Sequence, residues 1–351
     1  MRRRFFLRGY ENWLRLKLYH GTFGDDFIIE PWMTVRPVYS NENPDWPTWG
    51  VAIERERIEE TLAYRLSNPP IVTPDDISKL TAPWGVIDFE KTQNNIDMLK
   101  EAVGDIIDVI PDYFPGNYNL SYTLAYLLGP EQMFYQLCDR PDMVHALSKM
   151  ISENSMQVFD DYEKRGLLSN CDQSFLSNPG IQAMHYCHEL PDPGPRRVIP
   201  MCEHWIYDCS QEFESVGPEM YEEFVLSHQR PIYEKFGLTA YGCCEGLAKK
   251  IPYLKKIRNL RRVAVTPWAD DEECAAQLGP DYVVSWRPNP SEMVMNDFDP
   301  ERVKRIVRKV KKIYESYGCH WEVNLKDFIT VEHDRDRLRN WVIAVRQALE
   351  E

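Results

Sequence analysis

Short apolar runs alternate with longer amphipathic segments along most of this chain. From about residue 100 onward, each run is followed by a segment of about 12 to 20 residues whose apolar positions lie three and four apart. This alternation predicts repeated βα units around a parallel sheet. The runs that we assign to strands span residues 106–111, 167–171, 238–241, 262–266, 282–286 and 321–325, and a first strand is predicted at 27–32.

Helices are predicted at 142–163 and 218–236, and another begins just after Asp299. Two stretches interrupt the alternation. Residues 49–55 are typical of a hairpin strand followed by a Pro-rich link, and residues 177–215 contain five prolines and read as one long loop. A loop of this length favours a lid or a part of a binding site, with a disordered excursion as the alternative.

Composition narrows the choice of architecture and partners. With 351 residues and 43% hydrophobic content, the chain suits either two ordinary domains or one α/β barrel with insertions. The net charge of -14 argues against a nucleic-acid or anionic-membrane partner. The N-terminal arginines are not followed by an apolar signal region, and no apolar run is long enough to span a membrane, so we expect a cytoplasmic protein. Nine cysteines, an odd number, do not indicate a disulfide framework.

The segment 238–246, LTAYGCCEG, is the most informative part of the chain, because a short apolar run ends there in two thiols and a carboxylate. Side chains alternate along a strand, so Tyr241, Cys243 and Glu245 should share one orientation. A cysteine and a carboxylate two residues apart are able to reach one metal ion, zinc being the expected one. The alternative is that Cys243 and Cys244 pack as apolar side chains.

Several segments, in order, resemble the uroporphyrinogen decarboxylase superfamily, whose members are TIM barrels and include corrinoid-linked methyltransferases. The segments that carry the resemblance are NLSYTLAYLLG at 119–129, LCDRPDMVH at 137–145, SVGPEMYEEF at 215–224, RPNP at 287–290 and NLKD at 324–327. The resemblance implies a single (β/α)8 barrel over residues 1–351. Within it we expect an N-terminal extension with a hairpin over 1–100 and a lid-like insertion over 177–215, after strand 4.

Departures from the family's patterns bear on the chemistry. The decarboxylases have an arginine-rich segment after strand 1 that meets the carboxylates of a tetrapyrrole, whereas residues 30–36 hold only one arginine. Porphyrinogen decarboxylation is therefore not expected. The methyltransferase branch binds zinc through H-x-C on strand 5 and a later cysteine. Only Cys243 of that pattern is retained, and Lys326-Asp327 stands at the last position.

Polar and aromatic residues at the predicted strand ends are the further candidates, because barrel active sites lie at the carboxyl ends of the strands. The predicted catalytic residues are Asp172, Asp208, Tyr241 and Lys326. The predicted substrate-binding residues are Arg287, Gln211, and an aromatic wall of Trp32, Trp268 and Trp286. The predicted metal ligands are Cys243, Glu245 and Asp327. Structural roles are the alternatives throughout: helix capping or backbone hydrogen bonding for the aspartates, a salt bridge for Lys326 and Asp327, and core packing for the tryptophans.

The resemblance and these residues together favour a metal-assisted methyltransferase. It would move a methyl group between a small methylated substrate, such as a methoxylated aromatic ring, and a corrinoid carried by a partner protein. One alternative is a metal-free decarboxylase or other lyase acting on a small carboxylic acid, with Asp172 and Lys326 transferring protons and Arg287 holding the carboxylate. Another is a non-catalytic protein that binds a corrinoid or tetrapyrrole. A homodimer is compatible with the sequence.

Overall fold

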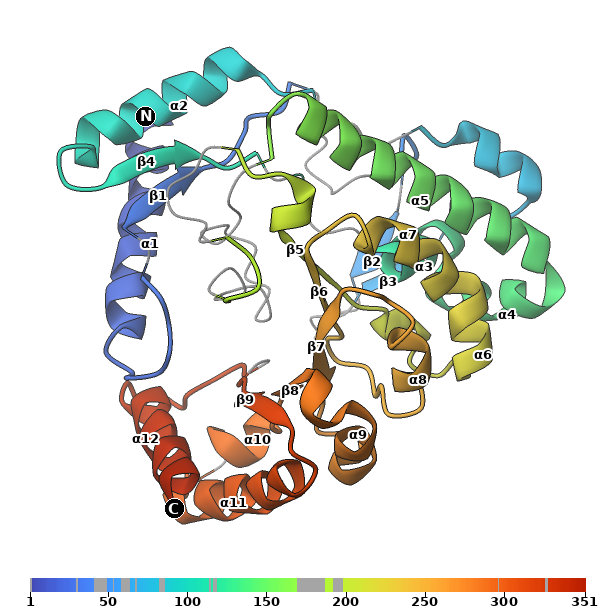
Figure 1. Ribbon diagram of the computed structural model, residues 1–351. Coiled ribbons are helices and arrows are strands. Elements are labelled where there is room, and N and C mark those ends of the chain that lie inside the picture. The colour runs from blue at the N-terminus through green and yellow to red at the C-terminus, as the bar shows by residue number, and fades with distance from the viewer. Residues whose placement is uncertain are drawn as a thin grey trace.

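Parallel strands joined by helices make up most of the computed structural model (Figure 1). It describes residues 2–29, 31–40, 49–52, 54–57, 64–66, 68–81, 86–113, 115, 119–168, 187–191, 198–295, 297–325 and 328–351. No helix in these ranges combines the length and the apolar run that a membrane crossing needs.

Five strands in the second half of the chain form one parallel sheet in sequence order. They are β5 (Trp205–Asp208), β6 (Leu238–Tyr241), β7 (Leu260–Val265), β8 (Val283–Trp286) and β9 (His320–Val323). The helices that follow them are α6 (Pro218–Tyr221), the π-helical turn η4 (Glu222–Leu226), α7 (Ser227–Tyr233), α8 (Ile251–Leu254), α9 (Asp271–Leu278), α10 (Pro290–Met293), α11 (Pro300–Ser316) and α12 (Arg337–Glu350). The predicted βα alternation is confirmed here, and four of the predicted strands match to within two residues.

A second parallel pair lies in the first part of the chain. Strand β1 (Trp32–Val35) pairs with β4 (Asp108–Pro111), and α2 (Phe89–Val103) connects them. The prediction of a first strand at 27–32 is wrong. Phe27 instead stacks on His20 at the end of α1 (Arg2–His20), with ring centroids 3.6 Å apart. Met33 belongs to a small core between α1, α2 and β4, and the strand therefore begins later.

The predicted hairpin is also displaced. The antiparallel pair consists of β2 (Arg55–Arg57) and β3 (Tyr64–Leu66), and the short 3-10 helix η1 (Pro74–Lys79) follows. Trp49, where the predicted hairpin strand begins, instead accepts a backbone hydrogen bond from Thr81, at 2.8 Å.

Three helices connect the two sheets and supply much of the core. They are α3 (Leu120–Leu128), α4 (Pro130–Asp139) and α5 (Pro141–Lys164). Leu120, Leu124 and Leu127 of α3 are fully buried. Helix α5 confirms the helix predicted at 142–163, and the segment α6–η4–α7 confirms the helix predicted at 218–236, with a π-helical turn in its middle.

The prediction that residues 177–215 form one long loop is wrong at its C-terminal end. Strand β5 lies inside this range, between the short helices η2 (Met201–Glu203) and η3 (Gln211–Phe213). All four residues of β5 are buried between neighbours, so this strand lacks the polar alternation that would mark it in the sequence. Residues 177–186 and 192–197 lie outside the described residues, as do residues 169–171 of the strand predicted at 167–171.

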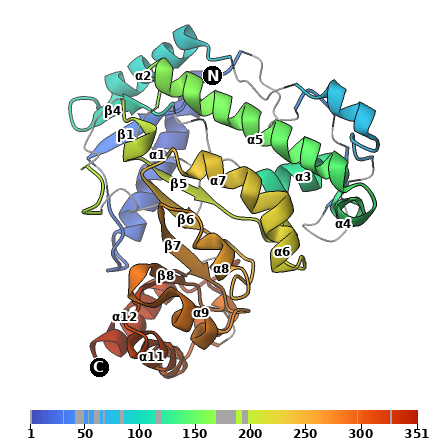
Figure 2. The same cartoon turned by 45° about the vertical axis from the view of Figure 1, so that its right-hand side comes forward.

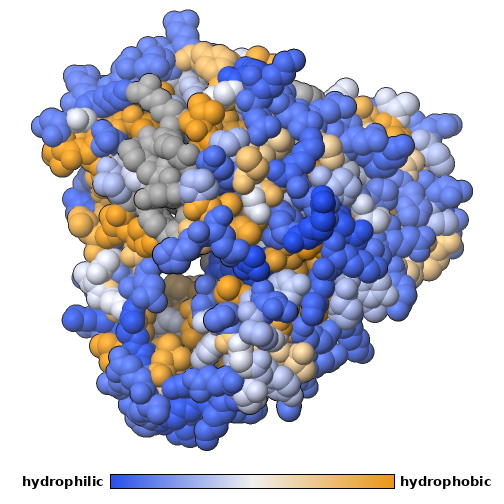
Figure 3. All heavy atoms as spheres, viewed as in Figure 1, coloured by the Kyte–Doolittle hydropathy of each residue, from blue (hydrophilic) through white to orange (hydrophobic). Residues whose placement is uncertain are grey.

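The end of α1 and the segment after it meet the last helix, α12, on one side of the molecule (Figures 1 and 2). Arg346 of α12 donates to the Gly24 carbonyl and to Asp26, each at 2.7 Å, and Tyr19 of α1 donates to the Arg335 carbonyl at 2.7 Å. In the same view the surface is hollowed between the N-terminal and C-terminal parts (Figure 3). An α/β arrangement with a five-stranded parallel sheet is thus established, and a closed barrel of eight strands stays a prediction.

Candidate functional site

The five-stranded sheet has two faces, and the strand register shows which residues share each one. Paired residues point to the same side, so Asp208, Tyr241 and Val263 lie on one face. Tyr233 of α7 contacts Asp208 and Tyr241, so this is the helix-facing side. Tyr207 and Arg262 point to the opposite side, which we call the inner face.

A buried polar network occupies the helix-facing side at the end of β5. Asp208 is 1% exposed and accepts hydrogen bonds from Tyr233 Oη at 2.6 Å, from its neighbour's backbone amide at 2.7 Å and from Gln229 Nε2 at 3.2 Å. Burial raises the pKa of this carboxyl well above its usual range, and the bond from Tyr233 opposes that rise. Backbone hydrogen bonding, the structural alternative for Asp208, is therefore observed.

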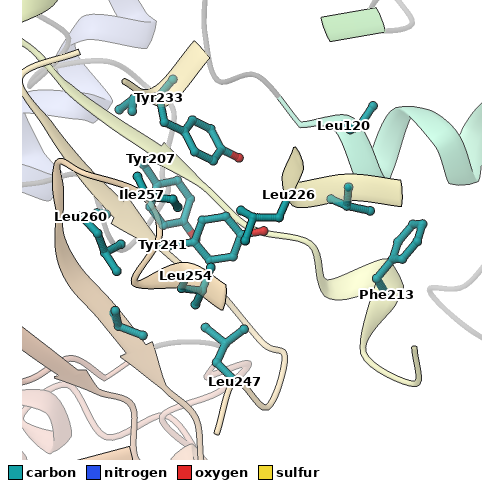
Figure 4. Packing of buried hydrophobic residues seen from close by; sticks show 14 of the residues in the cluster. Leu120, Tyr207, Phe213, Leu226, Tyr233, Tyr241, Leu247, Leu254, Ile257 and Leu260 are labelled. Carbon is teal, nitrogen blue, oxygen red and sulfur yellow. The ribbon is translucent and has the colours of Figure 1, made fainter. Parts of the chain in front are cut away.

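Tyr241 belongs to the same network. Its hydroxyl lies 2.7 Å from Ser210 Oγ and donates to Gln229 Oε1 at 3.3 Å. Figure 4 shows its ring reaching from β6 toward Leu226 of η4. The side chains of Asp208 and Tyr241 thus hold the strand ends against the helix layer, and their catalytic roles stay predictions.

Thiols gather at the ends of β5 and β6. Cys209 Sγ is hydrogen-bonded with Cys243, and this contact, together with burial, raises the pKa of the Cys209 thiol well above its usual range. Asn119 donates to Cys209 Sγ at 3.6 Å, and Cys244 Sγ lies 3.6 Å from Cys243 Sγ. Cys243 is half-buried, whereas Cys209 is 6% exposed. Cys243 is therefore the more accessible of the two sulfurs.

Glu245 connects the loops that follow β5 and β6. Its Oε1 accepts from the Ser210 amide at 2.8 Å and its Oε2 from the Cys243 amide at 2.9 Å. The carboxyl is 1% exposed, and burial raises its pKa. Both oxygens are therefore directed at backbone amides, and the role of Glu245 as a metal ligand stays a prediction.

Gly242 explains why strand parity does not extend past β6. Its φ is +103°, a conformation that glycine adopts readily, and an added Cβ would lie 2.6 Å from Leu247 Cδ1. The chain turns here, so Tyr241 is directed at α7 while Cys243 meets Cys209. The prediction that Tyr241, Cys243 and Glu245 share one orientation is wrong for Cys243 for this reason, whereas Tyr241 and Glu245 both contact Ser210.

Arg287 follows β8 and lies beside the thiols. It is 2% exposed, and its NH1 donates to the Cys243 carbonyl at 2.9 Å. Burial alone would lower the pKa of its guanidinium, but nearby Tyr207, Cys243 and Glu245 produce a net rise. Among the described residues, its buried Nε has no hydrogen-bond partner. A fixed positive charge with an unused donor therefore stands next to Cys243.

The predicted tryptophan wall does not form. Trp268 is 72% exposed, whereas Trp32 and Trp286 are buried. Trp286 packs edge-on against Trp321 of β9, with ring centroids 6.4 Å apart, on the helix-facing side. No ring contact joins the three predicted tryptophans within the ranges that the structure covers. Core packing, the structural alternative, accounts for Trp32 and Trp286.

The remaining predicted residues fall into two groups. Gln211 is exposed at the start of η3. Asp172, Lys326 and Asp327 lie outside the described residues. Cys209 was not predicted, although its place two residues after Tyr207 puts it on the inner parity.

The described residues supply only part of the predicted metal site. Within the described residues, no group of three His, Cys, Asp or Glu side chains is arranged to hold a metal ion. A catalytic zinc site uses three protein ligands and keeps one open position. The described donors alone therefore do not complete a zinc site, and the zinc prediction depends on Asp327.

Comparison with known proteins adds little to this geometry. No protein-family model matches the chain, and no curated protein matches it. Among solved structures, it is similar to a methyltransferase from Methanosarcina mazei, at 9% identity over 84% of this chain and 75% of that chain, with a TM-score of 0.48. A similarity of this degree carries no argument about activity.

Proposed function

We propose that this protein is a methyltransferase that moves a methyl group between a small methylated substrate and a corrinoid carried by a partner protein. The observation that carries the proposal is the thiol pair Cys209–Cys243 at the carboxyl ends of neighbouring parallel strands, beside the buried Arg287. Methyl groups are transferred by nucleophilic displacement, in which the reduced corrinoid would be the nucleophile and a cysteine sulfur is a suitable ligand for a metal that activates the methylated heteroatom. The sequence resemblance to the corrinoid-linked branch supports the same chemistry.

The residues around Cys243 have different roles in this proposal. Cys243 is the more accessible sulfur of the pair, so it is the one that would bind a metal. The Arg287 guanidinium stabilises negative charge that develops beside Cys243. Gly242 and Glu245 fix the loop that carries Cys243, so the sulfur need not reorganise during reaction.

Zinc is part of the proposal through the resemblance. Cys243 and Asp327 would be among its ligands, and zinc when bound would act as a Lewis acid toward the substrate heteroatom. A single cysteine ligand would leave room for the substrate in an open coordination position.

Substitution of the two adjacent cysteines tests the proposal. We expect Cys243→Ala to abolish methyl transfer from methoxylated aromatic or methylamine donors to a reduced corrinoid protein. Cys244→Ala is the matched control and should retain transfer, because Arg287 and Cys209 are both in contact with Cys243. Full activity of Cys243→Ala would rule out its proposed role.

A lyase that acts on a small carboxylic acid is the second candidate, favoured by the unused donor on Arg287. A guanidinium binds a carboxylate through two parallel N–H donors. In that case Arg287→Met should abolish carbon dioxide release from the acid, while Cys243→Ala should retain it. The two variants therefore separate the two functions.

A further inference from the structure

Two histidines from different helices meet on the outer side of the molecule. His145 of α5 and His228 of α7 approach with Nδ1 and Nε2 3.3 Å apart. Glu223 of η4 lies on the other side of His145, with Oε1 3.2 Å from Nε2. These side chains belong to α5, η4 and α7 of the helix layer, whereas the thiols follow β5 and β6 (Figure 1).

The carboxylate decides how the His145 ring is protonated. A carboxylate accepts only, so Nε2 of His145 carries the hydrogen that is donated to Glu223. In the neutral ring, Nδ1 is then a lone pair directed at His228. A histidine that binds a metal through one ring nitrogen commonly donates the hydrogen on its other ring nitrogen to a carboxylate, as His145 does here to Glu223.

The separation of the two nitrogens suits a shared metal ion. With Zn–N bonds of about 2.0–2.1 Å, two nitrogens on one tetrahedral zinc lie about 3.3–3.4 Å apart. The ring centroids are 5.6 Å apart and the planes meet at 46°. The rings therefore stand end to end, and a small rotation of each would direct both lone pairs at one ion.

Phe224 holds the His145 ring in place, and Lys149 places a positive charge near the pair. His145 stacks on Phe224, with centroids 4.5 Å apart and planes at 24°. Ser148 donates to the Phe224 carbonyl at 3.1 Å and anchors this π-helical turn to α5. Lys149 is the nearby positive charge, and it acts on His228. Lys149 thus weakens any cation site formed here.

We infer that His145 and His228 form a two-histidine site for a divalent transition-metal ion such as Zn²⁺, with Glu223 as the positioning residue. Water would complete the coordination, since within the described residues no third protein ligand joins the pair. Imidazole favours zinc, copper and nickel over magnesium or calcium. A bound ion would tie α5 to α7 and stabilise the folded state.

Titration with Co²⁺ and Zn²⁺ alone tests the site. Co²⁺ bound here should show no thiolate charge-transfer absorption. His145→Gln and His228→Gln should each abolish binding of the ion at this site, whereas Cys243→Ala should not. The Cys243 control separates this site from strand-end zinc, so either hypothesis is able to fail without the other.

If the histidine variants fold poorly, two further variants test metal binding at this site. Glu223→Gln should weaken binding by about 10-fold or more, because loss of an orienting partner typically costs that much. Lys149→Gln should tighten binding, because it removes a like charge and no ligand. Unchanged affinity in Glu223→Gln and Lys149→Gln, or in both histidine variants, would overturn the inference and leave a hydrogen bond only.

Discussion

Tyr233→Phe is the sharpest test of the buried network behind the site. The substitution removes one hydroxyl, whose hydrogen bond to Asp208 Oδ2 is 2.6 Å long, and leaves the ring in place. Both residues are buried, so water does not replace the lost donor. A hydrogen bond contributes about 0.5–1.5 kcal/mol between neutral groups and about 1.5–3 kcal/mol when one partner is charged. The cost of the variant therefore depends on the charge of Asp208.

The pH dependence follows from the direction of the Asp208 pKa. Burial raises that pKa in the folded state, so the stabilising contribution is fully present below the unfolded pKa and is lost as pH rises through the folded pKa. The Tyr233 hydroxyl favours the charged form, and its removal raises the folded pKa further. We expect a cost of about 1 kcal/mol near pH 5 that grows to about 2–3 kcal/mol at alkaline pH.

Urea unfolding across a pH series measures this cost. Tyr314→Phe is a matched positive control, because Tyr314 donates at 2.7 Å to Asp271, whose pKa is also raised by burial. Ser148→Ala is the neutral control, since its acceptor is a backbone carbonyl, and its cost should not vary with pH. A cost for Tyr233→Phe that is independent of pH would refute the reasoning about Asp208.

Three further substitutions test the loop and the chain ends. Gly242→Ala should lower the free energy of unfolding by about 2–4 kcal/mol, because φ is +103° and the new Cβ would meet Leu247; urea unfolding measures it. Glu245→Gln should cost about 1–3 kcal/mol by leaving one backbone amide unmatched. That cost should narrow as pH rises, since burial raises the pKa of Glu245 and the wild type loses stability in that direction. Arg346→Ala should lower the thermal midpoint slightly, and added salt should shrink the difference, because its partner Asp26 is exposed.

The repeated βα organisation could be predicted because burial on both faces leaves continuous apolar runs between helical segments. Strands β6 and β8 satisfy this pattern, whereas β9 is only half-buried and begins with the exposed His320. Strand β5 was missed because it ends in an aspartate and follows a Pro-rich stretch. Its pairing with β6 is a long-range contact that no local pattern reveals. The start of β1 was also predicted wrongly because of a contact outside the local pattern: Phe27 stacks on His20 and does not belong to the strand.

The site was predictable in position and less so in detail. Cys243, Glu245 and Arg287 were found because parallel strands end at one edge, where their side chains converge. Cys209 was not predicted. The sequence places Asp208 and Cys209 side by side, and only the pairing of β5 with β6 shows that the cysteine meets Cys243 while the aspartate meets α7.

Hydrogen bonds between the two loops, rather than a ligand motif, hold the thiols in place. The loop after β6 is tied to the loop after β5 by Glu245 on the Ser210 amide, and by the Gly246 amide on Glu214 at 2.6 Å. Lys250 adds a bond of 2.7 Å from Nζ to the Phe213 carbonyl. Because these contacts join the segments that carry Cys209 and Cys243, the sulfur pair is fixed before any ligand arrives. A chain that lacks the histidine of the zinc-binding pattern can therefore still present a preorganised sulfur at the same strand end.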